Sequence, residues 1–270
     1  MNQDLKHFYE ILGKNYVEEK FVHTSAWGLA RFRFVTKNLI KKYVNGGVWA
    51  DVGCGGGVYL PELLKSADKV IAIDISYPVI MRAMLRAHDC YFLVADACAL
   101  PLGKGVLDGV FSSEVIEHLP GYEGFLSDVA YSIKKGGKII ITCPNWHKKR
   151  PFREEPGVLR LFGIEDSYIH TAYKPEELAG IVERFGFRVI ERGSFEKELR
   201  LWGKLWDFLW GIIVNFAASV GMRKFTIFLY RLQCLLGGLI WRIVNFSGLA
   251  YVMRKLFKRG PRTYIVAEKV

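Results

Sequence analysis

The sequence predicts an α/β fold, in which a mostly parallel sheet carries helices on both faces. Apolar segments of strand length alternate with segments of helical spacing along most of the chain. Polar residues or a glycine loop follow several of these apolar segments directly. With 51% hydrophobic residues among its 270, the chain can also bury a substantial core.

The first apolar segment, 48–52, runs straight into a loop with Gly53, Gly55 and Gly57 at alternate positions. Glycine lets the backbone turn tightly and lets a ligand come close, because it has no Cβ atom. A helix expected over 58–64 would point its free N–H groups at that ligand. The loop predicts a nucleotide-type cofactor site, with an ordinary glycine-rich turn as the alternative.

The glycine spacing does not fit the dinucleotide fingerprint G-x-G-x-x-G/A. Counted from Gly53 the sixth position is Val58, and counted from Gly55 it is Leu60. The pattern is instead D-x-G-x-G-x-G, beginning at Asp51.

A second apolar strand, expected over 69–74, ends in Asp74, which lies 17 residues beyond Gly57. A carboxylate at this place holds ribose hydroxyls in βαβ nucleotide folds. The alternative is an aspartate that caps a helix or a turn.

Five further strands are expected, and they cover 91–97, 107–113, 136–145, 187–191 and 262–268. The first three of these five are also apolar segments that end in polar residues. In parallel sheets, ligands bind outside the carboxyl ends of the strands. We therefore expect the loop Asp51–Gly57, Asp74, Asp96 and Ser113 to lie along one edge of the sheet.

We expect the whole chain to divide into four regions. They are a helical arm (1–44), the core (45–194), a helical insertion (195–261) and the last strand of the core (262–270). The insertion separates the last two strands by about 70 residues and is unusually basic. Between residues 195 and 260 there are 11 Lys/Arg and 3 Asp/Glu, so this segment carries 11 − 3 = +8 of the net charge of +11.

Helical spacing within the insertion predicts amphipathic helices. Residues 201–215 place Trp202, Trp206 and Trp210 at i, i+4 and i+8, and tryptophan favours the boundary between lipid and water. The longest uncharged run, 208–222, has 15 residues, short of the roughly 20 that span a bilayer. We expect helices at an anionic membrane surface. The alternative is a helical subdomain or a homodimer interface.

The cysteine content and the first ten residues indicate in which cellular compartment the protein is expected. Five cysteines without a C-x-x-C pair argue against a disulfide framework and against a zinc cluster, and favour a reducing cytoplasm. Residues 1–10 are polar and charged, so no signal peptide is expected. Nucleic acid is a less favoured partner, because the positive charge lies among apolar residues.

In these motifs the sequence resembles the class I S-adenosylmethionine-dependent methyltransferases, in the branch of quinone-biosynthesis and related small-molecule methyltransferases. The segments that carry the resemblance are 51–57, Asp74, Asp96-Ala97, 113–119 and 136–145. The resemblance implies a seven-stranded, mostly parallel, Rossmann-like sheet and S-adenosylmethionine as the cofactor. No metal is implied.

The resemblance also implies roles for particular residues. Asp74 would bind the ribose hydroxyls, Asp96-Ala97 would border the adenine, and Ser113 would meet the methionine part. An upstream arginine, with Arg33 as the candidate, would contact the cofactor carboxylate. The complete expected cofactor set is Arg33, Asp51, Gly53, Cys54, Gly55, Asp74, Ile75, Asp96, Ala97 and Ser113.

His118 is the candidate catalytic residue, because imidazole near neutral pH can take a proton from an oxygen nucleophile. The alternative is that His118 caps or packs its helix. Asn145, His147 and Tyr173 could line an acceptor pocket. The basic run 146–150 in the connection 146–172 could meet an anionic acceptor, or could simply be solvated.

The expected function is methyl transfer to a hydrophobic or membrane-embedded acceptor, such as an isoprenoid quinone precursor or a lipid headgroup. The protein would be cytoplasmic, peripheral or monotopic on the inner face of the membrane. An insertion between the sixth and seventh strands of such a sheet would emerge on the cofactor side. The alternatives are a methyltransferase for a soluble metabolite or glycan, with the insertion as a dimer interface, and a non-catalytic S-adenosylmethionine-binding protein.

Overall fold

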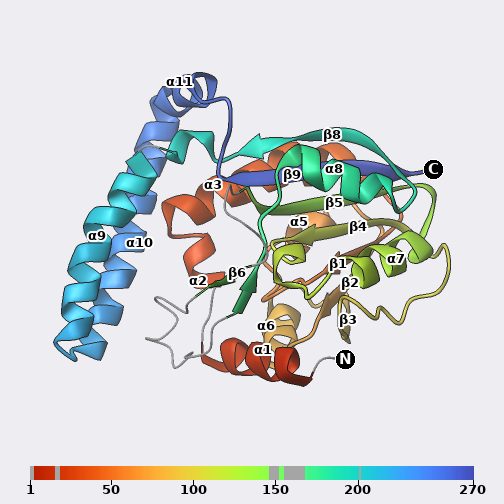
Figure 1. The fold of residues 1–270 in the computed structure, drawn as a ribbon, viewed down its shortest axis with the longest axis horizontal. Helices are drawn as coiled ribbons and strands as arrows, with labels where there is room; N and C mark the ends of the chain where they lie inside the picture. The colour runs from red at the N-terminus through yellow and green to blue at the C-terminus, as the bar shows by residue number, and fades with distance from the viewer. Residues whose placement is uncertain (1–2, 16–18, 146–151, 155–167, 201) are drawn as a thin grey trace.

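The computed structural model describes residues 3–15, 19–145, 152–154, 168–200 and 202–270 (Figure 1). Seven strands form one sheet in the order β3-β2-β1-β4-β5-β9-β8. Within it, β9 runs antiparallel to β5 and β8, and the other neighbouring pairs are parallel. The strands are β1 (Val48–Val52), β2 (Lys69–Asp74), β3 (Tyr91–Val94), β4 (Leu107–Ser113), β5 (Ile133–Pro144), β8 (Phe187–Phe195) and β9 (Arg262–Lys269). The predicted seven-stranded, mostly parallel sheet is confirmed.

The central strands form because their side chains are apolar on both faces, as a sheet covered on both sides requires. Consecutive residues of β5 show the two faces. Ile139 and Ile141 pack in a cluster with Phe125, whereas Ile140 packs in a second cluster with Leu39 and Leu63. All of these side chains are fully buried or nearly so.

Helices cover both faces (Figure 1). One face carries α7 (Glu123–Ser132) and α8 (Pro175–Glu183), and the other carries α5 (Leu60–Leu64) and α6 (Tyr77–Arg86). A short two-stranded sheet pairs β6 (Phe152–Glu154) with β7 (Tyr168–His170).

The expected N-terminal arm is helical over its described residues but is broken into pieces. They are α1 (Gln3–Asn15), α2 (Glu19–Val22), α3 (Ala26–Phe34), a π-helical segment Val35–Ile40, and α4 (Lys41–Tyr43). The helix α1 packs on α6, where the backbone at Gly13 lies against Ser76 and Val79. The arm therefore reaches the loop that follows β2.

The insertion consists of α9 (Trp202–Ser219), α10 (Arg223–Phe246) and α11 (Leu249–Leu256). The strand β8 has the same direction as β5, so its last residue, Phe195, lies at the edge where β1, β2 and β4 also end. The chain leaves the sheet at this edge, forms the α9–α10 hairpin beside the core, and returns through Gly260 to β9 (Figure 1). The predicted helical insertion between the sixth and seventh strands is confirmed.

Two tryptophans of the insertion contact the protein and are partly buried. Trp202 packs against a cluster that contains Ala26 and Ala30 of α3, and Trp206 lies against Gly237 of α10. Helix spacing gives the face that residues share but does not give the direction in which that face points.

The uncharged run 208–222 also underestimates the apolar length of the hairpin. Among the described helices, α10 is the one long and apolar enough to cross a membrane by length and composition, with 22% of its apolar window buried. Arg231 and Arg242 interrupt its uncharged runs without ending the helix.

Candidate functional site

The glycine loop is tied to the end of β2 and opens to space on one side. Gly53, Gly55 and Gly57 adopt positive φ angles of 75°, 53° and 76°. The N–H of Gly53 donates to the carbonyl oxygen of Ile73 at 2.7 Å. A Cβ atom at Gly53 would meet Val115 at 2.2 Å, whereas one at Gly55 would meet nothing within 4 Å. Gly53 is thus required for packing, and Gly55 borders free space.

Asp74 joins the second strand to this loop. Its Oδ2 accepts the Gly55 N–H and its Oδ1 accepts the Ser76 N–H, both at 2.9 Å. Burial raises the pKa of Asp74, although the N–H groups of Ser76, Gly55 and Ile75 act in the opposite direction. Since a carboxylate offers about four acceptor positions, Asp74 can still receive hydroxyl donors.

Asp51 and Cys54 lie beneath the loop. The side chain of Asp51 is buried, and its Oδ2 has no hydrogen-bond partner among the described residues. Burial, together with the charge of Asp74, raises the pKa of Asp51 well above its usual value. Burial likewise raises the pKa of the Cys54 thiol, which belongs to the core. An orphaned carboxyl oxygen beside an open glycine loop marks a place where a polar partner would be stabilising.

The ends of β3 and β4 complete the same edge. The Ala95 N–H donates to the Asp74 carbonyl, and Asp96 accepts the Cys98 N–H at 2.9 Å in a turn that includes Ala97. Ser113, at the end of β4, shares a hydrogen bond of 2.8 Å with Thr142 of β5. The structure brings the predicted loop, Asp74, Asp96 and Ser113 to one edge of the sheet.

His118 lies on a single 3₁₀ turn, Ile116–His118, where the sequence predicted a helix. Its ring stacks on His170 with 5.4 Å between centroids and meets Tyr9 of α1 edge-on at 6.2 Å. Its Nε2 is 3.9 Å from Glu117 Oε1, and its side chain is 26% exposed. His118 therefore faces α1 and β7 at the open edge of the sheet.

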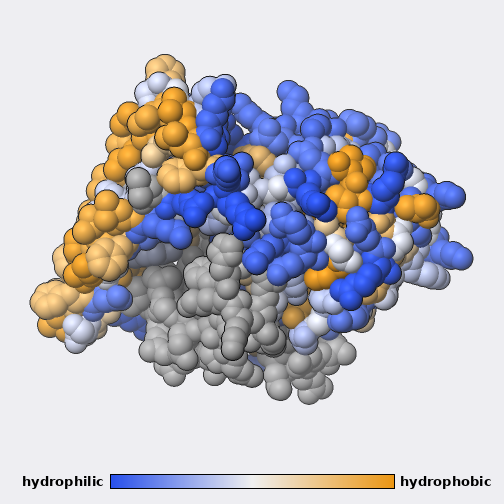
Figure 2. Space-filling model, turned by 45° about the horizontal axis from the view of Figure 1, so that its top comes forward, coloured by the Kyte–Doolittle hydropathy of each residue, from blue (hydrophilic) through white to orange (hydrophobic). Residues whose placement is uncertain are grey.

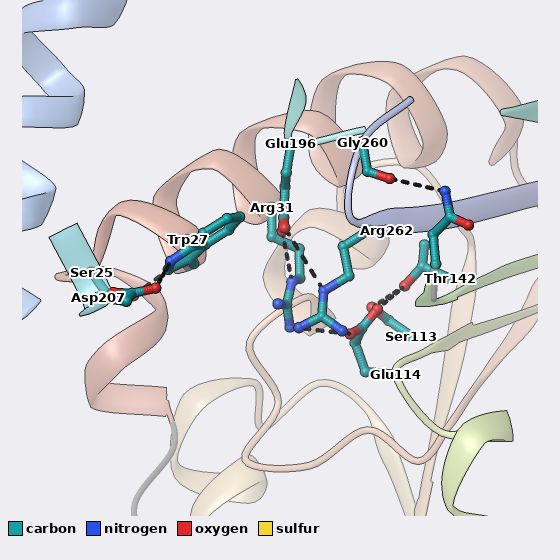
Figure 3. Close-up of polar contacts among 12 residues, drawn as sticks. Ser25, Trp27, Arg31, Ser113, Glu114, Thr142, Glu196, Asp207, Gly260 and Arg262 are labelled. Carbon is teal, nitrogen blue, oxygen red and sulfur yellow. Dashed lines mark hydrogen bonds and ion pairs between the residues drawn. The ribbon is translucent and has the colours of Figure 1, made fainter. Parts of the chain in front are cut away.

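Arg31, and not the predicted Arg33, reaches the ion pairs at this edge (Figure 3). Its Nη1 is 3.4 Å from Glu114 Oε2 and its Nε is 3.1 Å from Glu196 Oε1. Arg262 Nη1 is 2.7 Å from Glu114 Oε2, and Arg262 Nε is 3.7 Å from Glu196 Oε2. Residues two apart on a helix point to different sides, which separates Arg33 from this four-charge cluster.

The four-charge cluster, Arg31, Glu114, Glu196 and Arg262, draws on four elements (Figure 3). Glu114 follows β4, Glu196 follows β8, Arg262 begins β9 and Arg31 lies on α3. Among the described non-glycine residues, Glu114 and Glu196 alone have positive φ angles, 61° and 62°. This backbone conformation costs about 1–2 kcal/mol per residue, which the ion pairs must offset.

The charges of the cluster oppose the effect of burial on Glu114. Burial would raise the pKa of Glu114, but Arg262 and Arg31 lower it below its usual value. Thr142 adds a hydrogen bond to Glu114 Oε1 at 3.1 Å. Because Thr142 also bonds Ser113, the cluster is connected to the edge that holds the predicted cofactor residues.

A cavity of about 900 Å³ lies beside the four-charge cluster. Its walls come from α2 and α3, from the ends of β5 and β8 with the segment before β9, and from the inner faces of α9 and α10. Asn145 lines this cavity, and its amide donates a hydrogen bond to the Gly260 carbonyl at 2.9 Å. Tyr173 is buried in the core, and the residues 146–150, His147 among them, lie outside the described residues.

Sequence comparison relates this part of the chain to known proteins. Residues 50–141 match a family model described as a methyltransferase domain. The rat protein named ubiquinone biosynthesis O-methyltransferase, mitochondrial, is 29% identical to the chain over 195 residues, 63% of this chain and 55% of that protein. The chain spans about half the length of the curated relatives it matches.

Solved structures share the fold over most of the chain. An S-adenosylmethionine-dependent methyltransferase from Mesorhizobium loti has a TM-score of 0.52 at 14% identity, over 84% of this chain and 92% of that one. Phosphoethanolamine N-methyltransferase 2 from Haemonchus contortus has a TM-score of 0.56 at 20% identity, over 98% of this chain and 56% of that one. The chain resembles the class I S-adenosylmethionine-dependent methyltransferases in sequence and in fold.

The four-charge cluster was missed from the sequence. Glu114 lies within the segment 113–119 that carries the family resemblance, but Arg31 lies in the expected helical arm, Glu196 at the start of the expected insertion and Arg262 at the start of the expected last strand. Arg31 and Glu196 are 165 residues apart. No periodicity in the sequence relates charges at that separation.

Proposed function

We propose that the chain transfers a methyl group from S-adenosylmethionine to a hydrophobic or membrane-embedded acceptor, such as an isoprenoid quinone precursor or a lipid headgroup. One observation carries the proposal. The edge that holds the glycine loop and Asp74 is connected through the four-charge cluster to a cavity walled by the helical insertion. Relatives named as ubiquinone biosynthesis O-methyltransferases support the same acceptor class.

The residues present fit the cofactor. Space at Gly55 admits a ligand close to the backbone, and the orphaned Oδ2 of Asp51 lies next to that loop. Asp74 would receive the ribose hydroxyls, Asp96-Ala97 would border the adenine, and the backbone at Ser113 would meet the methionine part. When bound, the cofactor supplies an electrophilic methyl group on a sulfonium.

The chain itself would contribute mainly by holding the two reactants in position and by excluding water from them. The glycine loop and Asp74 would hold the methyl donor, and the cavity walls would hold the acceptor nucleophile in line with it. The carbon–sulfur bond would break, with its electron pair left on sulfur, as the bond from the methyl carbon to the acceptor forms. Holding the two reactants in contact can supply about 7–11 kcal/mol at best. Walls from α3 and α9, and α1 above the loop after β2, would exclude water during this step.

An oxygen nucleophile must lose its proton, and we propose His118 for that step. Its imidazole is partly exposed at the edge of the sheet, next to Glu117. Glu117 is buried, and burial with the neighbouring Glu114 raises its pKa well above the usual value. Glu117 is therefore neutral, and the carboxylate that would stabilise an imidazolium at His118 is that of Glu114, whose pKa is lowered by Arg262, Arg31 and His118.

The insertion would hold the acceptor at a membrane. Figure 2 shows hydrophobic residues over the outer side of the α9–α10 hairpin. Phe208, Ile212 and Phe216 of α9 are 66%, 57% and 72% exposed. Basic residues flank the helices at 223–224, 254–255 and 258–259, which suits anionic lipid headgroups on the inner face of a membrane.

The test measures methyl transfer directly. The purified full chain is incubated with methyl-labelled S-adenosylmethionine and with separate lipid and aqueous extracts of cells. We expect label in the lipid fraction, none with the Asp74→Ala variant, and normal transfer with Asp89→Ala, which removes an exposed acid. Label confined to the aqueous fraction would support a soluble acceptor. Cofactor binding without any transfer would show a non-catalytic protein.

A further inference from the structure

The cavity carries more positive than negative side chains. Among its described lining residues, five are Lys or Arg and two are Asp or Glu, a balance of 5 − 2 = +3. They are Arg31, Arg200, Lys204, Arg259, Arg262, Glu196 and Asp207.

Two of these cations are already neutralised. Arg31 and Arg262 both pair with Glu114 and Glu196, so the four-charge cluster contributes no net charge. Asp207 does not pair with a cation. It accepts the indole N–H of Trp27 at 2.6 Å and the amide of Gln233 at 3.3 Å.

The other three cations have no carboxylate partner in the part of the chain that the structure describes. Arg200 and Lys204 lie where the chain enters the insertion, and Arg259 lies where it leaves. Arg200 Nη1 donates to the Arg259 carbonyl at 3.2 Å, and its guanidinium lies 5.7 Å from the ring centroid of Phe257. These contacts hold the Arg200 guanidinium next to Arg259, at the base of the hairpin.

Apolar side chains also line the cavity. They are Phe21 and Val22 of α2, Trp27 of α3, Trp206 of α9 and Cys234 of α10. The cavity thus combines cationic and apolar lining residues, next to a hairpin whose outer face is hydrophobic (Figure 2).

We propose that this cavity binds an anionic amphiphile, and that Arg200, Lys204 and Arg259 hold its phosphate or carboxylate group. Charge-assisted hydrogen bonds from guanidinium groups favour such anions, and arginine matches their planar or forked oxygens. The assignment of this amphiphile as the methyl acceptor rests on the proposed function. The proposal that the cavity binds it is independent of that function.

Calorimetric titration of the full chain with dodecyl phosphate, below its critical micelle concentration, tests the site. We expect a single saturable site whose affinity falls at least about tenfold in R200Q/K204Q/R259Q, because the variant lacks the three cations proposed to hold the anion. The control variant K37Q/K41Q/K104Q loses the same charge from exposed positions elsewhere and should bind as the wild type does.

Three results would overturn the proposal. Equal weakening in both triple variants would show general attraction to a basic protein. Equal affinity for the neutral dodecyl maltoside would remove the role of the anion. Equal affinity for inorganic phosphate would show a free-phosphate site without an apolar part.

A second titration separates this inference from the proposed function. Both triple variants should bind S-adenosylhomocysteine as the wild type does, which also shows that they are folded. Selective binding of dodecyl phosphate without methyl transfer to any extract would support the proposed binding site and contradict the proposed reaction. Methyl transfer to a lipid that R200Q/K204Q/R259Q performs with unchanged KM would sustain the reaction and end the role of these cations.

Discussion

Asp51 is a buried carboxyl group next to the glycine loop, and it makes the stability of the free protein depend on pH. Its pKa is raised well above the usual value by burial and by the charge of Asp74. Below about pH 4, the ordinary pKa of an aspartate, both folded and unfolded states hold the proton. As pH rises from there towards the raised pKa, the unfolded state ionises first, so stability falls.

Asp51→Asn removes this dependence while keeping the shape of the side chain. We expect the variant to gain stability relative to the wild type as pH rises from about 4 to 8, by about 1–3 kcal/mol in total. Thermal unfolding of both proteins without cofactor, at several pH values, measures the gain. A difference in Tm that stays constant over this range would contradict the argument.

The position of Asp74 at the end of β2, hydrogen-bonded to the glycine loop, was predictable because a local sequence pattern indicates it. Asp74 ends an apolar run at a fixed distance from a glycine loop, and both features lie within one βαβ unit. The partners of Arg31 lie 83 and 165 residues away, so only the folded chain brings them together. The choice between Arg31 and Arg33 depended on the direction in which α3 presents each side chain.

The four-charge cluster joins elements that would otherwise meet only through the sheet edge: α3, the ends of β4 and β8, and the start of β9. Removing one partner of a buried ion pair leaves an uncompensated charge, which costs about 3–5 kcal/mol. We expect Glu196→Gln to destabilise the protein by about 3 kcal/mol. Denaturant unfolding measures this loss.

The contact between Arg31 and Glu196 adds a second expectation. The double variant R31M/E196Q should lose clearly less stability than the sum of its single variants, because both remove the same 3.1 Å ion pair. The exposed pair of Lys65 and Glu62, at 2.6 Å, is the control and should contribute at most about 1 kcal/mol. Additive losses at Arg31 and Glu196 would show that the cluster is not a unit.

Elements were predictable to within a few residues where periodicity defines them. The strand Leu107–Ser113 matches its predicted range, whereas β8 continues to Phe195, past the predicted end at 191. The extension pairs with β9 along its length, and that pairing is a tertiary property. The inward orientation of Trp206 was unpredictable for the same reason, because it depends on the packing of α9 against Gly237.

At the scale of the whole molecule, we propose that the exposed hydrophobic side of the α9–α10 hairpin contacts a membrane. We expect F208S/I212S/F216S, on the outer face of α9, to abolish co-sedimentation with vesicles containing anionic lipid. The control M81S/M84S/L85S alters exposed apolar residues of α6, where Leu85 is 89% exposed, and should sediment as the wild type does. Equal sedimentation of both variants would remove the hairpin as the membrane contact.

The topology of the whole chain followed from the order of its motifs, and the position of the insertion on the cofactor side followed from strand direction. The cavity could not be predicted from the sequence. It requires α3, α9 and α10 to enclose a space against the sheet edge, and their packing depends on contacts such as Gly238 against the Thr24 carbonyl.

The chain leaves the sheet and returns to it at almost one point, since Phe195 pairs with Arg262 and its carbonyl lies directly against Gly260. A segment with such closely spaced ends can be gained or lost in evolution as a unit, without moving the strands on either side. An ancestral protein of this fold could therefore have acquired the whole helical insertion, and with it two walls of the cavity, in a single genetic event, while the strands of the sheet stayed the same.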